Sequence, residues 1–218
     1  MSHKVHPKSY RIRTTEDWSS RGFYQKDLPR FLKEDFEIRK FLVEKLDKMG
    51  VEKIEIERFA KKTNIIIASS RPGLIIGRGG EGVEKIKKDL VKRLEKKLSR
   101  KFPDGEINIE IKEVRNPWTS APLSTDWVSE QLRRRVRHKR VINQAMDKIM
   151  SNKEVLGSRI ELSGRLEGKE IARREWLQKG RLPRQTIRAD IDYHQGIAIC
   201  TYGTIGIKIW IYKGDKFE

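Results

Sequence analysis

The residues best suited to chemistry form a glycine-rich segment, Ile75 to Val83, inside a strongly basic chain. Four of its residues are glycine: Gly77, Gly79, Gly80 and Gly82. Such a segment exposes backbone N–H groups and lets another backbone approach closely. We expect a helix from Val83 to Lys97, whose positive dipole end would favour an anionic oxygen at this loop. The segment therefore predicts a phosphate-binding loop.

Two known glycine patterns overlap in this loop. Gly77, Gly79 and Gly82 spell G-x-G-x-x-G, the dinucleotide fingerprint, which needs a strand leading directly into the loop and an acidic residue about 20 positions later. The turn 71–73 interrupts the chain just before the loop, and the segment 100–104 is basic. The same loop also spells G-x-x-G, with which KH domains clamp a single-stranded nucleic-acid backbone. We favour this KH clamp, formed by Gly77, Arg78, Gly79 and Gly80, over a cofactor site or a plain glycine turn.

The charge balance points to the same class of partner. The chain has 49 Lys and Arg residues against 31 Asp and Glu residues, a formal net charge of +18. Such an excess repels itself in a compact fold, and a polyanion is its usual compensation. A basic membrane-surface protein is the competing class. We expect no membrane association, because the sequence has no apolar stretch of spanning length and no signal peptide.

Cysteine and histidine usage argues against a metal, a cofactor or a disulfide. Cys200 is the single cysteine, and it lies among apolar residues in a predicted strand. One cysteine forms no internal disulfide and fits a reducing, cytoplasmic setting. We therefore expect no metal, no cofactor and no small-molecule substrate.

The periodicity of apolar residues predicts an α+β fold with two domains. Residues 1–26 have little periodicity and form a basic N-terminal arm. Residues 27–116 show helix, strand, strand, glycine loop, helix and strand, which predicts helices on one face of a three-stranded sheet. Residues 117–123, with two prolines, form a linker. Residues 124–218 are predicted to form a second α+β domain with a long helix, about 126–150, on a mainly antiparallel sheet.

Two basic clusters lie in the second half of the chain. The first is a run of six cations in eight residues of the predicted helix: Arg133, Arg134, Arg135, Arg137, Lys139 and Arg140. The second follows the first strand of that domain and includes Arg165, Lys169, Arg173, Arg174, Arg181 and Arg184. Runs of this kind are most often nucleic-acid patches, although a solvated basic helix is the alternative.

Two other functional classes compete with this interpretation. A free RNA-binding regulator would not require the second basic domain, and an assembly GTPase would need a P-loop that the sequence lacks. A nucleic-acid enzyme would need a metal-binding carboxylate cluster or an activated lysine, and Asp190 with Asp192 is the only suggestive pair. Because Arg188 is adjacent, we interpret this pair as structural.

Long segments of the chain resemble the third small-subunit ribosomal protein family, bacterial type. These segments are Lys4-Val5-His6-Pro7, the glycine loop, which resembles that of a type II KH domain, residues 163–176 (SGRLEGKEIARREW), residues 188–193 (RADIDY) and residues 201–211 (TYGTIGIKIWI). They follow the family order over essentially the whole chain. The resemblance implies a ribosome-bound structural protein without enzyme activity.

The resemblance also implies partners and contact residues. The family contacts the ribosomal RNA of the small-subunit head, neighbours the tenth and fourteenth small-subunit proteins, and lines the channel by which mRNA enters together with the fourth and fifth. We assign the cations 133–140 to mRNA, with Lys139 and Arg140 at the positions that help melt mRNA structure. The residues assigned to ribosomal RNA are Lys4, His6, Arg11, Arg165, Lys169, Arg173, Arg174, Arg181 and Arg184.

The chain departs from the family pattern at three places. Asn143 replaces a third cation on the mRNA helix, which predicts weaker melting. The clamp is Gly-Arg-Gly-Gly, with one cation where family loops commonly carry two. A lysine-rich extension, Lys96 to Lys101, lengthens the unit before its last strand.

Overall fold

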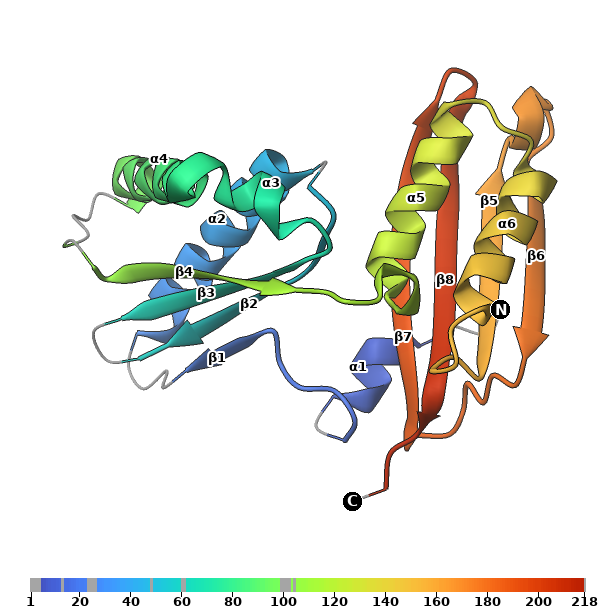
Figure 1. The fold of residues 1–218 in the computed structure, drawn as a ribbon, viewed down its shortest axis with the longest axis horizontal. Helices are drawn as coiled ribbons and strands as arrows, with labels where there is room; N and C mark the ends of the chain where they lie inside the picture. Colours follow the sequence, from blue (N-terminus) through green and yellow to red (C-terminus); the bar gives the residue numbers. More distant parts are fainter. Residues whose placement is uncertain are drawn as a thin grey trace. The chain divides into compact units, whose positions relative to one another are not determined.

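The structure is a computed structural model that describes residues 5–12, 14–22, 27–47, 49–59, 62–98, 103 and 105–217. The chain divides into two compact units (Figure 1). One contains residues 18–115, and the other combines residues 1–17 with residues 116–218. The first part of the predicted arm is therefore assigned to the C-terminal unit.

The first unit is a mixed four-stranded sheet with helices packed on its core face. Its elements are β1 (Ser20–Gly22), α2 (Leu28–Leu46), β2 (Val51–Arg58), β3 (Thr63–Ser69), α3 (Pro72–Ile76), a 3-10 turn (Arg78–Gly80), α4 (Glu81–Leu98) and β4 (Ile107–Glu113). The strand order is β1-β2-β3-β4, in which β2 and β3 are antiparallel and the two outer pairs are parallel. The predicted α+β fold with three strands is confirmed, and the short β1 from the predicted arm adds a fourth.

The core of this unit follows from the period of its apolar residues. Ile38, Phe41 and Leu42 recur at helical spacing in α2 and are buried. They pack with Ile65 and Ile67 of β3, whose side chains alternate toward the same face. Leu90 and Leu94 bring α4 into the same core.

A buried ion cluster joins the start of α2 to the end of β2. Arg58, only 9% exposed, donates from Nε and Nη2 to Asp35 Oδ1 at 2.8 and 2.5 Å and from Nη1 to Glu34 Oε2 at 2.9 Å. Its guanidinium also lies 4.9 Å from the centre of the Phe31 ring. The two carboxylates thus offset the cost of burying the charge, and Glu34 also pairs with Arg30 at 3.4 Å.

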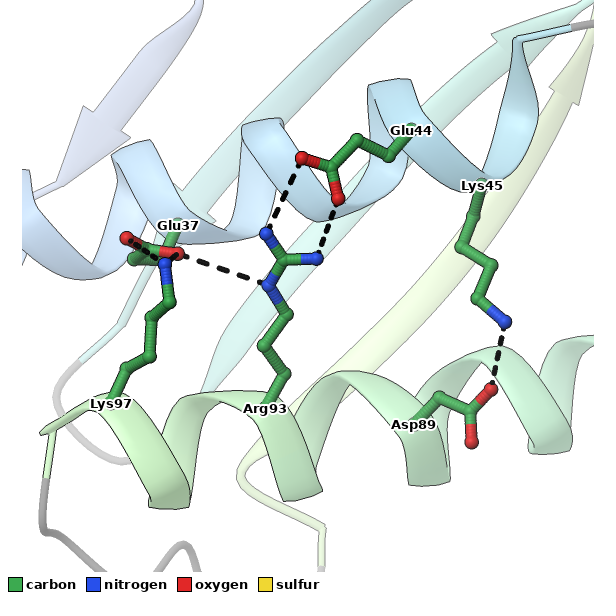
Figure 2. A network of polar contacts seen from close by, with 6 residues as sticks. All are labelled: Glu37, Glu44, Lys45, Asp89, Arg93 and Lys97. Carbon is green, nitrogen blue, oxygen red and sulfur yellow. Dashed lines mark hydrogen bonds and ion pairs between the residues drawn. The ribbon is translucent and has the colours of Figure 1, made fainter.

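Helices α2 and α4 are linked on their outer side by four ion pairs, drawn in Figure 2, one of which joins Arg93 to Glu37 at 3.9 Å. Lys97 Nζ donates to both carboxylate oxygens of Glu37 at 2.8 and 2.7 Å. Arg93 donates to Glu44 at 2.7 Å, and Lys45 donates to Asp89 at 3.1 Å. Lys97 of the lysine-rich extension is therefore engaged within the fold, while residues 99–101 lie outside the described residues.

The C-terminal unit is a four-stranded antiparallel sheet of order β6-β5-β8-β7. Its elements are α1 (Pro7–Arg11), a 3-10 turn (Pro117–Thr119), α5 (Ala121–Arg133), α6 (His138–Met150), β5 (Gly157–Gly164), a 3-10 turn (Leu166–Gly168), β6 (Arg173–Gly180), β7 (Ala189–Cys200) and β8 (Gly203–Asp215). Helices α5 and α6 cover one face through Val128, Val141 and Met146. The predicted antiparallel α+β domain is confirmed.

The single long helix predicted for residues 126–150 is wrong. Arg135 adopts φ 60°, which no α-helix accommodates, so the chain turns after α5 and resumes as α6. No glycine or proline marks the break.

Helix α5 also begins at Ala121, within the range predicted as linker, with Pro122 in its first turn. Strand β6 was not predicted, because this outer strand is largely exposed on both sides and its sequence does not alternate.

Replacing Arg58 should destabilise the first unit strongly. Arg58→Met leaves two buried carboxylates without their guanidinium, which typically costs about 3–5 kcal/mol. Urea unfolding followed by circular dichroism measures the loss. Lys45→Met is the matched control, because it removes a cation from the exposed pair with Asp89 and should cost less than about 1 kcal/mol. Equal losses in the two variants would contradict a special role for the buried cluster.

The ion pairs between α2 and α4 should make stability depend on pH in a defined direction. Hydrogen bonding to Lys97, with the charges of Lys97 and Arg93, holds the pKa of Glu37 below its usual value, and Arg93 does the same for the pKa of Glu44. A carboxylate with a lowered pKa in the folded state stabilises it fully above the ordinary glutamate pKa and loses this effect as pH falls through the lowered pKa.

We therefore expect the wild type to melt higher than Glu37→Gln near pH 7. The gap should narrow as pH falls through the acidic range, and added salt at neutral pH should narrow it too. Thermal melts at several pH values measure this gap. A gap that is constant with pH would show that Glu37 acts through packing alone.

Candidate nucleic-acid interface

The glycine loop lies between two helices. Helix α3 ends at Ile76, the turn 78–80 follows, and α4 begins at Glu81. Because a helix and not a strand leads into the loop, the context required for a dinucleotide fingerprint is absent from this segment. The helix–loop–helix arrangement is the one expected of a KH clamp.

Each glycine of the loop has its own structural reason. Gly77, Gly79 and Gly80 adopt φ values of 70°, 60° and 83°, which residues with a Cβ atom rarely adopt. A Cβ on Gly82 would lie only 2.5 Å from the Ile75 carbonyl oxygen, so α4 starts directly against α3. A Cβ on Gly79 or Gly80 would meet nothing within 4 Å. Those two positions therefore face open space, and exposed Arg78 carries the loop's cation.

The six cations predicted for mRNA lie around the turn between α5 and α6. Arg133 is the last residue of α5, and Arg134 and Arg135 follow it in the turn. Arg137 precedes α6, and Lys139 and Arg140 lie in its first turn. All six are exposed. Arg134 pairs with Glu130, and the other five form no ion pair with any carboxylate in the described part of the chain. Asn143 is exposed at helical spacing from Lys139 and Arg140, on the same face of α6.

The second basic cluster is divided by the structure. Arg173, Lys169, Arg181 and Arg184 are exposed, and none of them forms an ion pair with a described carboxylate. Arg174 donates to buried Glu161 at 2.6 Å, which lowers the pKa of that carboxyl against the effect of burial. Arg165 donates to the carbonyl oxygens of Lys169 and Tyr202 at 3.1 and 3.3 Å.

Arg11 requires a correction, because its assignment to ribosomal RNA does not fit its environment. It is 1% exposed and donates to the carbonyl oxygens of Pro7, Arg184 and Thr186 at 3.1, 3.1 and 2.8 Å. A guanidinium enclosed in this way holds α1 against the C-terminal unit and does not reach a phosphate.

His6 and Lys4 are the other residues of the arm that were assigned to ribosomal RNA. His6 caps α1 by accepting from the Lys8 amide at 3.2 Å, and its ring packs edge-on against Tyr193. Partial burial, with the charge of the neighbouring Lys8, lowers the pKa of His6. Lys4 lies outside the described residues.

The carboxylate pair Asp190 and Asp192 is structural, as interpreted from the sequence, although its partners differ from the expected Arg188. Asp190 pairs with Lys216 at 3.1 Å. Asp192 pairs with Lys8 at 3.0 Å and accepts from the Ala121 amide at 2.7 Å. Arg188 pairs with Asp215 at 3.4 Å.

Sequence reasoning missed His138, which organises the cationic turn. This buried ring contacts Glu167 through Nδ1 at 2.9 Å and Glu175 through Nε2 at 2.8 Å. Both contacts are within hydrogen-bond distance, and they tie the start of α6 to the 3-10 turn Leu166–Gly168 and to β6. The hydrogen bond from His138 lowers the pKa of Glu175. No local signal marks His138, because its partners lie 29 and 37 residues away.

A cavity of about 320 Å³ lies beside this turn. Arg133, Arg135, Arg137 and Arg165 line it together with the Tyr202 ring. The structure thus brings members of the two basic clusters, separated by about thirty residues of sequence, to one site. Tyr202 was not predicted as a site residue either.

Neither a metal site nor a membrane span is found among the described residues. No group of three or more His, Cys, Asp and Glu side chains is placed there to hold a metal ion. No helix in this part of the chain has the length and apolar character to cross a membrane.

Comparisons with known proteins agree with the geometry. A sequence model of the KH domain matches residues 37–119, and one described as ribosomal protein S3, C-terminal domain, matches residues 128–211. The small ribosomal subunit protein uS3 of Maridesulfovibrio salexigens is 45% identical over all of this chain and 98% of its own length. The uS3 proteins of Caldicellulosiruptor saccharolyticus and Laribacter hongkongensis are 44% and 42% identical over 99% of this chain, covering 93% and 88% of their own lengths. These full-length similarities show that the chain belongs to the uS3 family of small ribosomal subunit proteins, which are structural components of the ribosome and not enzymes.

Proposed function

We propose that this protein binds ribosomal RNA in the head of the small subunit and contacts mRNA where it enters the ribosome. The observation that carries the proposal is the row of exposed cations on the α5–α6 turn, of which five form no ion pair within the described residues. A fold that pairs Arg58, Arg93, Lys97 and Arg174 with carboxylates leaves this row to a polyanion from outside.

The cations of the α5–α6 turn suit contact with mRNA, and the second basic cluster suits contact with ribosomal RNA. Arginine and lysine on a helix surface contact phosphate without reading bases, which suits a channel that must pass any mRNA. Lys139 and Arg140 lie on one turn of α6 and would hold one strand of an opening mRNA duplex. The exposed cations Lys169, Arg173, Arg181 and Arg184 remain assigned to ribosomal RNA.

The clamp loop is the proposed contact of the first unit with single-stranded RNA. Its open glycines would let a sugar–phosphate backbone approach, while Arg78 supplies charge. Exposed Leu74 and Ile76 beside the loop offer an apolar surface for bases.

The proposed protein partners follow from the family resemblance. They are the tenth and fourteenth small-subunit proteins as neighbours in the head, and the fourth and fifth at the mRNA channel. The two-unit chain, with basic surfaces on both units, also fits a ribosomal component better than a free regulator with a single RNA-binding surface.

A double substitution in the clamp tests the first contact. Arg78→Asp with Gly79→Asp should weaken binding of the purified protein to single-stranded RNA. The slope of log affinity against log salt should fall by about 0.7 for each phosphate that the variant no longer neutralises. Both side chains fit the fold, because Arg78 is exposed, a Cβ at Gly79 meets nothing within 4 Å, and aspartate tolerates a positive φ.

Lys112→Asp with Gly105→Asp is the matched control for the clamp. It makes the same change in charge at an exposed lysine and at a glycine that also has a positive φ and open space. Binding that falls equally in both variants would assign the effect to net charge and remove the clamp from the proposed site.

Substitutions on α6 test the mRNA contact. Ribosomes that carry Lys139→Ala with Arg140→Ala should translate through an mRNA hairpin more slowly than wild type, with unstructured mRNA and subunit assembly little affected. Asn143→Lys should have the opposite effect, because it adds a cation on the same exposed face of α6. Toe-printing or single-ribosome translation of hairpin messages measures both. Normal passage by the double variant would end the assignment of Lys139 and Arg140 to mRNA.

A further inference from the structure

The cavity beside the α5–α6 turn has three walls that lie far apart in sequence. The first is the turn itself, with Arg133, Arg135 and Arg137. The second is the 3-10 turn that contains Glu167 and Gly168, and the third is the β7–β8 hairpin, with Tyr202. All three belong to the C-terminal unit.

Specific contacts join these walls to one another. His138 at the start of α6 is bonded to Glu167 of the second wall at 2.9 Å. Arg165, just before that wall, donates to the Tyr202 carbonyl of the third at 3.3 Å. Cys200 Sγ lies 3.7 Å from the Leu132 carbonyl oxygen at the end of α5. The cavity is therefore held in shape by the protein before any ligand arrives.

Backbone strain is concentrated at the same place. Among the described residues that are not glycine, only Arg135 and Glu167 have a positive φ, at 60° and 58°. Both line this cavity. Non-glycine residues in the left-handed region cost energy and cluster at functional sites. The strained conformation at Arg135 ends α5 and holds this side chain on the cavity wall.

The lining offers two kinds of contact. Arg133, Arg135 and Arg137 are cations without a described carboxylate partner. Tyr202, a residue that is 55% exposed, provides an aromatic ring. A Cβ at Gly168 would lie 3.1–3.2 Å from three atoms of this ring, so one side of the ring rests on the glycine while much of the remainder is open.

We propose that this cavity binds a single unstacked nucleotide of RNA, with its base stacked on Tyr202 and its phosphate held by Arg133, Arg135 and Arg137. Arginine forks match phosphate oxygens, and an aromatic ring stacks on any base, so the pair selects a nucleotide and does not select a sequence. An acidic peptide would use the arginines but gain little from the ring. The proposal rests on the proposed RNA-binding function and adds a specific site to it.

The test uses the purified full-length protein and a short single-stranded RNA that carries 2-aminopurine, a base whose fluorescence is quenched by stacking. Wild type should quench the probe and bind it. Tyr202→Leu should lose the quenching and weaken binding about five- to tenfold, within the range of one base–aromatic stack. Tyr202→Phe should keep both, because the ring remains.

The phosphate contact is tested with Arg135→Asn. Asparagine tolerates the left-handed conformation, so the turn survives while the cation is removed. Binding should weaken a few-fold, and the salt slope should fall by about 0.7. Arg135→Lys keeps the charge but not the guanidinium fork, so its affinity should lie between those of wild type and Arg135→Asn.

Two controls separate the cavity from general effects. Tyr10→Leu removes an exposed tyrosine on α1, and Lys153→Ala removes an exposed cation elsewhere on the C-terminal unit. Both should leave quenching and affinity close to wild type. Circular dichroism and thermal melts of every variant check that the fold is retained.

The outcomes distinguish this site from the general function. Unchanged affinity and quenching in Tyr202→Leu, with weaker binding by Lys139→Ala and Arg140→Ala, would overturn the nucleotide site and leave the RNA-binding surface standing. An acidic hexapeptide that displaces the RNA probe at lower concentration than a hexanucleotide of natural bases would also overturn it. No RNA binding by wild type would overturn both.

Discussion

An excess of positive charge governs how this fold uses its polar side chains. With 49 basic and 31 acidic residues, the fold has too few carboxylates to pair every cation. The placement of those carboxylates therefore decides which cations hold the protein together and which face outward. Glu34 and Asp35 form buried ion pairs with Arg58, and Glu161 of β5 forms an ion pair with Arg174 of β6. The proposed RNA contacts lie among the exposed cations that remain.

Pairing within the fold is concentrated where elements must be joined. Glu37, Glu44 and Asp89 take part in the ion pairs that link α2 to α4 (Figure 2). The cations of these pairs therefore help to hold the two helices of the first unit together. Lys148 is occupied in a different way, because its ammonium lies 4.8 and 4.5 Å from the rings of Trp118 and Trp127. The cations in these contacts are held in place by the fold, so they are poorly available to bind RNA phosphates.

At the turn between α5 and α6, most cations are exposed and form no ion pair with a described carboxylate. His138 contacts both Glu167 and Glu175, and the charges of Lys139 and Arg173 also act on Glu175. Arg133, Arg135 and Arg137 form no ion pair with a described carboxylate, and they lie around a cavity whose walls are joined by specific contacts. A buried histidine with two carboxylate partners thus supports an exposed cationic site, and the strained φ of Arg135 and Glu167 lies on the same walls.

The fold class, the family, the KH domain and the two basic clusters could all be predicted from the sequence alone. These depend on local signals, namely helical and alternating periods, glycines that need a positive φ, and motifs such as SGRLEG and RADIDY. The sequence did not determine the break after Arg133, because a positive φ at an arginine has no sequence signature. Nor did it separate buried Arg11, with its three carbonyl acceptors, from exposed Arg181 and Arg184. Those distinctions, and the meeting of Arg135, Glu167 and Tyr202 around one cavity, were decided by tertiary structure, because pairing and burial depend on residues that only the folded chain brings within a few ångströms.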